Sequence, residues 1–430
     1  MDVINSKILL FLDYPDIINA CKGVPDFFRI CNKPYFWALK ADRDFSISST
    51  ELLLVPGSNN KKRYEFIYNI KDSDRGLVKA SKLGILSLVK YYLKQGGDLN
   101  GKALRSAVIK GYFHIVKYLI EQGADFHAYT EEVLRLAAGE GHLDIVKYLI
   151  GLGADLHAND EEALVWAAED GHLDVVKYLV EQGANIHVRN EWALRLAAEY
   201  GHLSVVKYLV EQGANLHAKD ELALRLTAEN GRLDIVKYLI EQGANLHARG
   251  EEALRSAAEE GHIDIVKYLV EQGADFHAKN EQALRSAAEN GHLDVVKYLI
   301  ELGADFHTED EYIFREGALR SAAGNGHLDV VKYLIELGAN FHTEDEYALR
   351  WSARNGHLNV VKYLVEQGAN LHAFREGALR LAAMYGHLDV VKYLVEQGSK
   401  NDEALSLANE YGRLDIVKYL TGESTRSKID

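Results

Sequence analysis

The sequence predicts an all-α solenoid of about twelve short helix–turn–helix units, preceded by a small helical domain. Three observations support this fold class: a motif related to Val-Lys-Tyr-Leu recurs along most of the chain, apolar residues at helical spacing flank each copy, and glycines separate the helices. With 430 residues, 47% of them hydrophobic, the chain is neither a mini-protein nor a disordered polymer. Its rare residues divide it in two, because every proline and cysteine falls in the first 56 positions: Pro15, Cys21, Pro25, Cys31, Pro34 and Pro56.

The recurring motif fixes the period of the repeat. Successive motif lysines are separated by 27 residues, then by 30 residues six times, and then by 35, 30, 30 and 26 residues; they are Lys90, Lys117, Lys147, Lys177, Lys207, Lys237, Lys267, Lys297, Lys332, Lys362, Lys392 and Lys418. A constant period of this length is typical of solenoids, in which each unit buries its apolar face against its neighbours. The sequence therefore predicts a stacked array rather than a globular core.

One unit, residues 161–190, shows how a repeat is built. Its first helix carries a single apolar face made of Ala163, Leu164, Ala167 and Ala168. Gly171 ends that helix, because helices commonly close on a residue with positive φ. A second helix is expected from His172 to about Gln182, with Gly183 closing it and with a buried stripe of Leu173, Val175, Val176, Leu179 and Val180.

These boundaries divide the chain into four parts. We expect a helical domain in 1–45, a linker with a connecting helix in 46–72, the array in 73–425 and a polar tail in 426–430. The units are expected near 73–100, 101–130, 131–160, 161–190, 191–220, 221–250, 251–280, 281–315, 316–345, 346–375, 376–400 and 401–425. The single long unit contains an insertion, 308–317, which duplicates neighbouring sequence and could project as a bump on the array.

The repeated segment resembles the ankyrin repeat. Residues 197–215, Ala-Ala-Glu-Tyr-Gly-His-Leu-Ser-Val-Val-Lys-Tyr-Leu-Val-Glu-Gln-Gly-Ala-Asn, are similar to the two-helix core of that family almost position for position. The period departs from the usual length of about 33 residues, and an Ala-Leu-Arg step such as 193–195 replaces the Thr-Pro-Leu-His turn. The resemblance implies a protein–protein interaction module whose loops and first helices line a concave face that binds a target protein.

Positions that vary within the fixed repeat are the candidates for specificity. Exposed aromatic residues on first helices and loops would anchor an interface. The expected partner-binding residues are Trp192, Tyr200, Tyr347, Phe374 and Tyr385, and additionally Trp166 and Trp351, for which packing between units is the competing interpretation.

Two further columns of polar residues have structural interpretations. The eighteen histidines mark the starts of second helices or the ends of units, and we expect them to bond loop backbone groups rather than metal. Arginines recur from Arg105 to Arg380, and nearly every unit places a glutamate a few residues before its arginine, such as Glu191 or Glu221, which offers an ion-pair partner one helical turn away.

The first 45 residues resemble an F-box. The resemblance lies in an Ile-Leu-Leu-Phe-Leu helix, a Pro-Asp-Ile-Ile turn, a Phe-Arg-Ile-Cys segment and a closing Arg-Asp-Phe, with three short crossing helices expected. It implies docking onto a Skp-type adaptor of a cullin–RING ubiquitin ligase through Leu9, Leu10, Leu12, Pro15 and Ile17. The alternative is a hydrophobic cap that seals the first repeat.

Charge and composition bound the possible partners. The net charge is −15, with +1 in residues 1–73 and −16 in the rest, so we expect no nucleic-acid and no membrane partner. Two cysteines ten residues apart lack the spacing of a metal or redox pair. We expect small buried thiols in a reducing compartment and a cytoplasmic monomer, with a nuclear location left open.

The leading hypothesis is a substrate receptor that links a target protein to a ubiquitin ligase. A scaffold whose first helices only cap the array is the alternative, and an enzyme hidden in residues 1–72 is disfavoured. We expect no catalysis, cofactor or metal, because no catalytic or ligand set remains once the repeat is explained. An F-box-like segment joined to short, proline-poor repeats resembles ankyrin proteins of giant DNA viruses.

Overall fold

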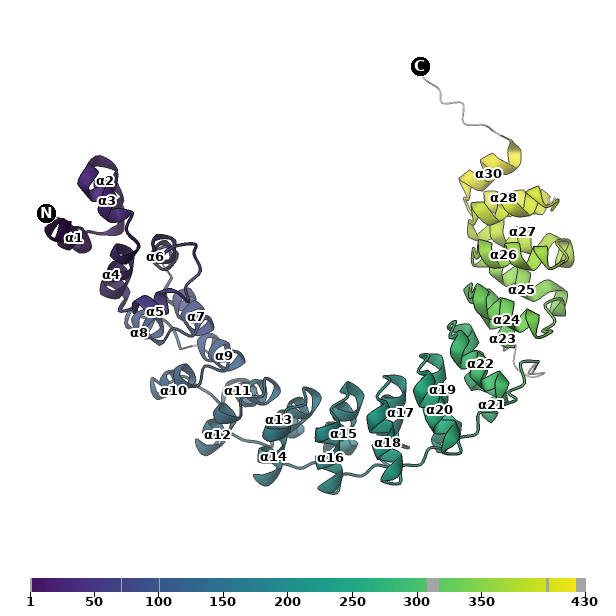
Figure 1. Cartoon of the computed structure of the whole chain (residues 1–430), viewed down its shortest axis with the longest axis horizontal. Coiled ribbons are helices and arrows are strands. Elements are labelled where there is room, and N and C mark those ends of the chain that lie inside the picture. The colour runs from purple at the N-terminus through teal and green to yellow at the C-terminus, as the bar shows by residue number, and fades with distance from the viewer. Residues whose placement is uncertain (1, 71, 100, 308–316, 400–401, 423–430) are drawn as a thin grey trace, which may run out of the picture. The chain divides into compact units, whose positions relative to one another are not determined.

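The protein is all-helical throughout the part of the chain that the structure describes, which confirms the predicted fold class (Figure 1). The structure is a computed structural model that describes every residue except 1, 71, 100, 308–316, 400–401 and 423–430. The predicted insertion and the polar tail therefore lie almost entirely outside the described residues. The chain forms two compact units, one of residues 1–197 and 204–214 and the other of residues 198–203 and 215–430.

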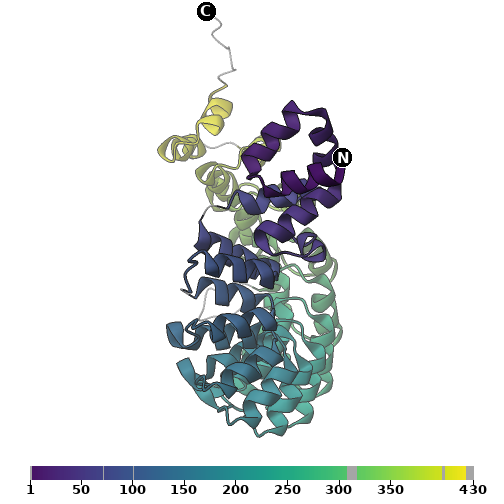
Figure 2. The same cartoon turned by 90° about the vertical axis from the view of Figure 1, so that its left-hand side faces the viewer.

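Four short helices, not the expected three, make up the first 45 residues, and they cross one another (Figure 2). They are α1 (Asp2–Phe11), α2 (Tyr14–Gly23), α3 (Pro25–Cys31) and α4 (Pro34–Phe45). Proline stands in the first turn of α2, α3 and α4, where its missing N–H costs nothing and its fixed φ favours the helix. The additional helix is α3, because Pro25 starts a new helix directly after Val24.

This N-terminal domain has a core of its own. Ile17, Phe36 and Trp37 are buried, and the Trp37 indole N–H donates to the Cys31 carbonyl at 2.6 Å. The connecting segment that follows contains α5 (Ser49–Leu52) and α6 (Asn60–Tyr68).

The two cysteines are joined, which corrects the expectation of free thiols. Cys21 near the end of α2 and Cys31 at the end of α3 form a disulfide, with Cα atoms 6.3 Å apart. Both side chains are buried, as expected of small core residues. Sequence spacing alone missed the pair because the packing of α2 against α3, not a short motif, brings the two helix ends together.

Twelve helix pairs follow, as the period predicts. The first helices are α7 (Ser73–Leu83), α9 (Lys102–Ile109), α11 (Ala128–Gly139), α13 (Ala158–Glu169), α15 (Val188–Tyr200), α17 (Leu222–Glu229), α19 (Ala248–Glu259), α21 (Ala278–Glu289), α23 (Ala318–Asn325), α25 (Thr343–Arg354), α27 (Ala373–Tyr385) and α29 (Asp402–Glu410). The second helices are α8 (Leu86–Lys94), α10 (Phe113–Glu121), α12 (Leu143–Gly151), α14 (Leu173–Glu181), α16 (Leu203–Glu211), α18 (Leu233–Glu241), α20 (Ile263–Glu271), α22 (Leu293–Glu301), α24 (Leu328–Glu336), α26 (Leu358–Glu366), α28 (Leu388–Glu396) and α30 (Leu414–Thr421).

Small residues hold neighbouring first helices together. In α19 the pair Ala257 and Ala258 is fully buried, and in the second helix α20 the branched residues Ile265, Val266 and Leu269 fill the other side. Successive first helices such as α19 and α21 pack directly on one another (Figure 1). Burial of the apolar face thus depends on the adjacent unit, as in other solenoids.

A left-handed turn opens most first helices. In seven units three consecutive residues have positive φ: Asn159–Glu161, Arg189–Glu191, Lys219–Glu221, Arg249–Glu251, Lys279–Glu281, Glu344–Glu346 and Phe374–Glu376. Among the described residues no strand occurs, so this turn takes the place that a β-hairpin loop would occupy. A non-glycine residue in this region costs on the order of 1 kcal/mol, so the turn needs compensating contacts.

Candidate protein-interaction surface

A histidine–glutamate pair compensates the left-handed turn. The glutamate that ends the turn is buried, and its Oε1 atom meets Nδ1 of the histidine four residues earlier, at 2.6 Å for His157–Glu161 and 2.7 Å for His187–Glu191. The same pair recurs in six further units: His127–Glu131, His217–Glu221, His247–Glu251, His277–Glu281, His342–Glu346 and His372–Glu376. In this column the histidine rings therefore bond carboxylates and not the loop backbone groups that the sequence predicts. The hydrogen bond to Glu161 raises the pKa of His157.

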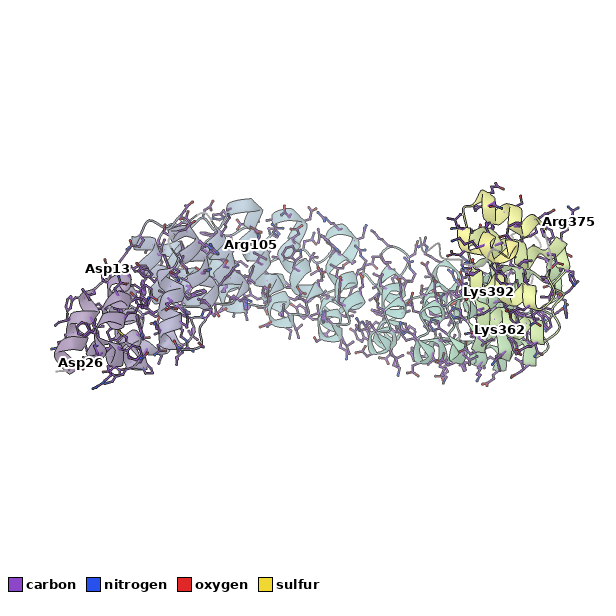
Figure 3. The ribbon with its side chains drawn as sticks, turned by 90° about the horizontal axis from the view of Figure 1, so that it is seen from above. Asp13, Asp26, Arg105, Lys362, Arg375 and Lys392 are labelled. Atoms are coloured by element: carbon purple, nitrogen blue, oxygen red, sulfur yellow. A yellow bond between two sulfur atoms is a disulfide. The ribbon has the colours of Figure 1, made fainter. Side chains whose placement is uncertain are left out.

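The arginine column pairs differently from the sequence prediction. Glu191 and Glu221 contact histidines, so they are not the partners of the arginines in their own units. Instead an arginine reaches a glutamate of the following unit, as in Arg105 (labelled in Figure 3) with Glu132 at 3.0 Å. Equivalent pairs are Arg135–Glu162, Arg225–Glu252, Arg320–Glu344 and Arg380–Glu403. The column is structural, as expected, but it links units rather than helical turns.

The second histidine column bonds loop backbone, as the sequence predicts. Nε2 of His262 lies 2.9 Å from the Glu229 carbonyl of the preceding unit, and His292 makes the same contact with Glu259 at 2.8 Å. A Cβ atom at Gly231 would lie 2.8 Å from the His262 ring, so the glycine leaves room for the imidazole. Burial lowers the pKa of another member, His357.

The lysines that define the repeat also link units, a role the sequence analysis missed. At least nine of the twelve amino groups lie over the tyrosine ring of the next second helix. Lys362 and Lys392, both labelled in Figure 3, lie 5.6 Å and 5.7 Å from the ring centroids of Tyr393 and Tyr419. Such cation–π contacts contribute about 0.5–1 kcal/mol at exposed sites. The constant 30-residue spacing of Lys and Tyr was the signal that could have revealed them.

The structure separates the predicted aromatic residues into two groups. Trp166 and Trp192 belong to α13 and α15, are half-buried, and lie under the guanidinium groups of Arg135 and Arg189. Tyr200, at the end of α15, is 48% exposed. The other four gather on the neighbouring helices α25 and α27: Tyr347, Trp351, Phe374 and Tyr385.

Packing between units accounts for part of the tryptophan column. Gly324 of α23 lies against Trp351 of the next unit, and a Cβ atom there would come within 3.2 Å of the indole Cδ1. Gly139 and Trp166 are related in the same way, at 3.4 Å. Each tryptophan thus fills space that a missing side chain leaves in the preceding unit.

The four clustered aromatic residues contact two arginines. We call this set, Tyr347, Arg350, Trp351, Arg354, Phe374 and Tyr385, the arginine–aromatic cluster. The Arg350 guanidinium lies 4.5 Å from the Phe374 ring centroid and 5.6 Å from that of Tyr347. The Arg354 guanidinium lies 4.4 Å from Trp351 and 4.7 Å from Tyr385, and it donates to the Tyr385 hydroxyl at 3.0 Å.

A pocket of about 250 Å³ opens beside this cluster. Its lining comes from α25, α27 and α29: Arg350, Trp351, Phe374, Gly377, Arg380, Leu381, Met384 and Leu407. Phe374 stands in the left-handed turn at φ 49° and is 58% exposed. Because the same turn occurs in six other units, the scaffold, not the phenylalanine, sets this conformation.

The predicted adaptor-binding residues are only partly accessible. Leu9 and Ile17 are fully buried in the N-terminal core, Leu10 and Leu12 are half-buried, and Pro15 is exposed. Sequence reasoning missed exposed apolar side chains on α1 and α3, notably Phe11 at 73% and Phe28 at 59%. A period of 3.6 residues along residues 4–12 would have placed Ile8 and Phe11 on one face.

The array decides the family. A family model described as ankyrin repeats in three copies matches residues 77–160, 134–220, 194–280, 224–310, 284–375 and 372–429. The chain belongs to the ankyrin-repeat family. Helices α1–α6 lie outside the matched residues of this ankyrin array. No curated protein matches the chain.

The ankyrin array is also similar to solved structures. One of them is the crystal structure of the human ASB11 ankyrin repeat domain, with 26% sequence identity and a TM-score of 0.39; the match covers 43% of this chain and 90% of that one.

Among the described residues no three His, Cys, Asp or Glu side chains gather as metal ligands would. Within those residues, too, every helix is too short or too polar to cross a bilayer. The ankyrin array is a protein–protein interaction module, and the arginine–aromatic cluster is its most distinctive surface.

Proposed function

We propose that the chain is a substrate receptor: the ankyrin array holds a target protein while α1–α4 dock onto a Skp-type adaptor of a cullin–RING ubiquitin ligase. The observation that carries the adaptor role is an excess of exposed apolar side chains in the N-terminal domain. Of sixteen large exposed apolar side chains in the described residues, six lie in the N-terminal domain, between Ile8 and Leu39. Concentrated apolar exposure marks interaction surfaces.

These side chains are exposed although the N-terminal domain already has a core. Ile8 and Phe11 share one face of α1, Phe28 projects from α3, and Leu39 is half exposed on α4. The buried residues Leu9 and Ile17 would support this surface from below, while Leu10, Leu12 and Pro15 contribute at its margin. An F-box-like role needs such an apolar surface for the adaptor.

A second candidate function, a scaffold whose first helices only cap the array, is favoured by a different contact. Phe45 of α4 lies edge-on against Tyr91 of the first repeat, with ring centroids 5.3 Å apart. The Tyr92 hydroxyl donates to the Ile67 carbonyl at 3.3 Å. The N-terminal domain therefore also covers the first unit, and the two roles are compatible.

Capture of a purified Skp-type adaptor by the full-length chain tests the proposal. We expect capture by the native chain and its loss in a Phe11→Asp, Phe28→Asp double variant, because both rings are exposed and neither supports the core. Leu302→Asp is the matched control, an exposed apolar residue of the array. Absence of capture by the native chain would refute the ligase role and leave the scaffold.

Other properties follow from this proposal. A receptor of this kind needs no catalytic residue, metal or cofactor of its own, because the ligase supplies the chemistry. It would act as a monomer in the cytoplasm or nucleus, where the ligase operates.

A further inference from the structure

The first helices differ in charge at one position, four residues after the column arginine. Six units carry glutamate there: Glu169, Glu199, Glu229, Glu259, Glu289 and Glu410. The first three units lack it, with Lys82, Ile109 and Gly139 at this position, and so do three consecutive later units, in which the residues are Gly324, Arg354 and Met384. The array, part of a segment (residues 74–430) with a net charge of −16, therefore loses its negative charge at this column across α23, α25 and α27 and gains a guanidinium in α25.

We propose that the pocket between α25, α27 and α29 docks an acidic segment of the target protein, with one apolar side chain in the pocket and flanking carboxylates on Arg350 and Arg354. This inference rests on the proposed role of the array in binding a target. Guanidinium groups bind carboxylates in a two-point geometry that lysine cannot reproduce.

Both arginines are held in place before any partner arrives. Arg350 donates from Nε to the Asp345 carbonyl at 2.9 Å and from Nη2 to the Glu344 carbonyl at 2.8 Å, and its guanidinium lies over Phe374. Arg354 is held by Trp351 and by the Tyr385 hydroxyl. Side chains fixed in advance lose less conformational entropy on binding, which increases affinity.

Neither arginine has a carboxylate within ion-pair distance among the described residues, whereas Arg105 and Arg380 do. The charge of Arg350 and Arg354 is thus available to a partner. Elsewhere the acidic array repels an acidic segment, so these two arginines determine where such a segment binds.

The pocket itself fits a single side chain. Its volume of about 250 Å³ is below the range of about 300–1,000 Å³ typical of small-molecule sites. Its apolar lining comes from Trp351, Phe374, Leu381, Met384 and Leu407. A leucine, methionine or phenylalanine of the target would bury its side chain there, and the flexible Met384 would adapt to it.

The test uses the full chain and fluorescence anisotropy with labelled nine-residue peptides. The probe has a central leucine flanked on each side by two aspartates and two glycines. We expect it to bind about tenfold or more tightly than a peptide with serine in place of aspartate, and to weaken several-fold when leucine becomes alanine or salt rises.

Two variants assign that binding to the pocket. Arg354→Glu introduces the residue type that six other units already carry at this position, so we expect it to fold and to reduce affinity about tenfold or more. Arg350→Gln should also weaken binding. Its matched control is Arg255→Gln, because Arg255 donates to the same two loop carbonyls, Gly250 at 3.0 Å and Arg249 at 3.3 Å, but faces no aromatic cluster.

Several results would overturn the inference. Equal binding of the aspartate and serine peptides, an unchanged acidic preference in Arg354→Glu, or tighter binding of a labelled single-stranded oligonucleotide would each do so. Adaptor capture without peptide binding would contradict this pocket alone. Peptide binding without adaptor capture would contradict only the ligase role.

Discussion

The first helices α19 and α25 have the same framework but present opposite chemistry. Both begin with a left-handed turn that ends on a buried glutamate paired to a histidine, and both place an arginine on the same two loop carbonyls. The next positions differ: Ser256 and Glu259 in α19 correspond to Trp351 and Arg354 in α25. Backbone and surface are therefore specified by separate sets of residues.

This comparison shows where specificity can change without cost to the fold. The positions one and four residues after the column arginine lie off the buried alanine–leucine face of their own helix, so they can vary more than the framework. They remain coupled to each other between units where a tryptophan packs on a glycine, as in Gly324 and Trp351. The framework positions cannot vary in this way, because each one contacts the neighbouring unit. The following predictions test this separation, beginning with the largest effect.

Truncating the buried leucine should destabilise both helices equally. Leu254→Ala and Leu349→Ala each remove a side chain that is 1% exposed, and each should lower the free energy of unfolding by about 2–5 kcal/mol. Urea unfolding followed by circular dichroism measures this loss. A clear difference in the free energy of unfolding between the two variants would show that the surface residues of α25 also stabilise the fold.

Removing the buried glutamate should destabilise the protein less than truncating the leucine does. The loss should be larger in α25 than in α19. Glu251→Ala and Glu346→Ala each break a histidine contact, for about 1–3 kcal/mol. Glu346 in addition accepts from the Asn370 backbone N–H, in the loop between α26 and α27, at 3.0 Å. Hydrogen exchange should therefore reveal faster exchange of the Asn370 amide in Glu346→Ala; unchanged protection would argue against this link.

A substitution that fills the space beside Arg350 should weaken binding of the acidic peptide while changing stability little. A Cβ atom at Gly377 would lie 2.7 Å from Arg350 Cδ, so Gly377→Ala must displace that flexible side chain. We expect a stability change below about 1 kcal/mol, since alanine favours helix, together with weaker binding of the acidic peptide. Glu252→Ala is the corresponding substitution in α19 and should leave peptide binding unchanged.

His157 and His357, one from each histidine column, should titrate in opposite directions, which is the smallest effect. The pKa of His157 is raised by Glu161 above the ordinary value of 6.5, so its contribution to stability is full below that value and is lost as pH rises through the folded-state pKa. Burial lowers the pKa of His357, so its contribution is full above 6.5 and is lost as pH falls through the folded-state pKa. Proton NMR titration of the two rings checks both directions; the reverse order would contradict the assigned contacts.

The helices of the array could be predicted from the sequence because each unit repeats the same pattern of apolar residues and glycines. Residues Ala163 to Ala168 and Gly171 specify a helix and its end by local spacing, and the structure follows them. Contacts that reach into the next unit were not accessible, because i,i+4 reasoning on a single helix cannot find a partner 27 residues away, such as Glu132 for Arg105. The same reasoning assigned Glu191 to an arginine, although its partner is His187, four residues earlier.

The sequence predicted the aromatic residues of the candidate site but not its arginines. Variability at fixed positions pointed to Tyr347, Trp351, Phe374 and Tyr385, which gather on α25 and α27. Arg350 was missed because it belongs to the arginine column, which was given a structural role. Arg354 was missed because it is a single charged residue at a position where six other units carry a glutamate. In the N-terminal domain, Leu9 and Ile17 fall in the core because four crossing helices bury faces that a single-helix pattern does not define.

The contact between Gly324 and Trp351 limits how the units can be exchanged. Moving the tryptophan-bearing unit alone behind a neighbour that carries glutamate at the glycine position would force a large ring against a side chain, while the abandoned glycine would face an unfilled gap. The segment that must be moved as one piece is therefore not a single repeat. It begins at the end of the first helix of one unit, continues through the second helix of that unit and includes the first helix of the next unit. Recombination or protein engineering that cuts inside a unit, rather than between units, preserves the fit.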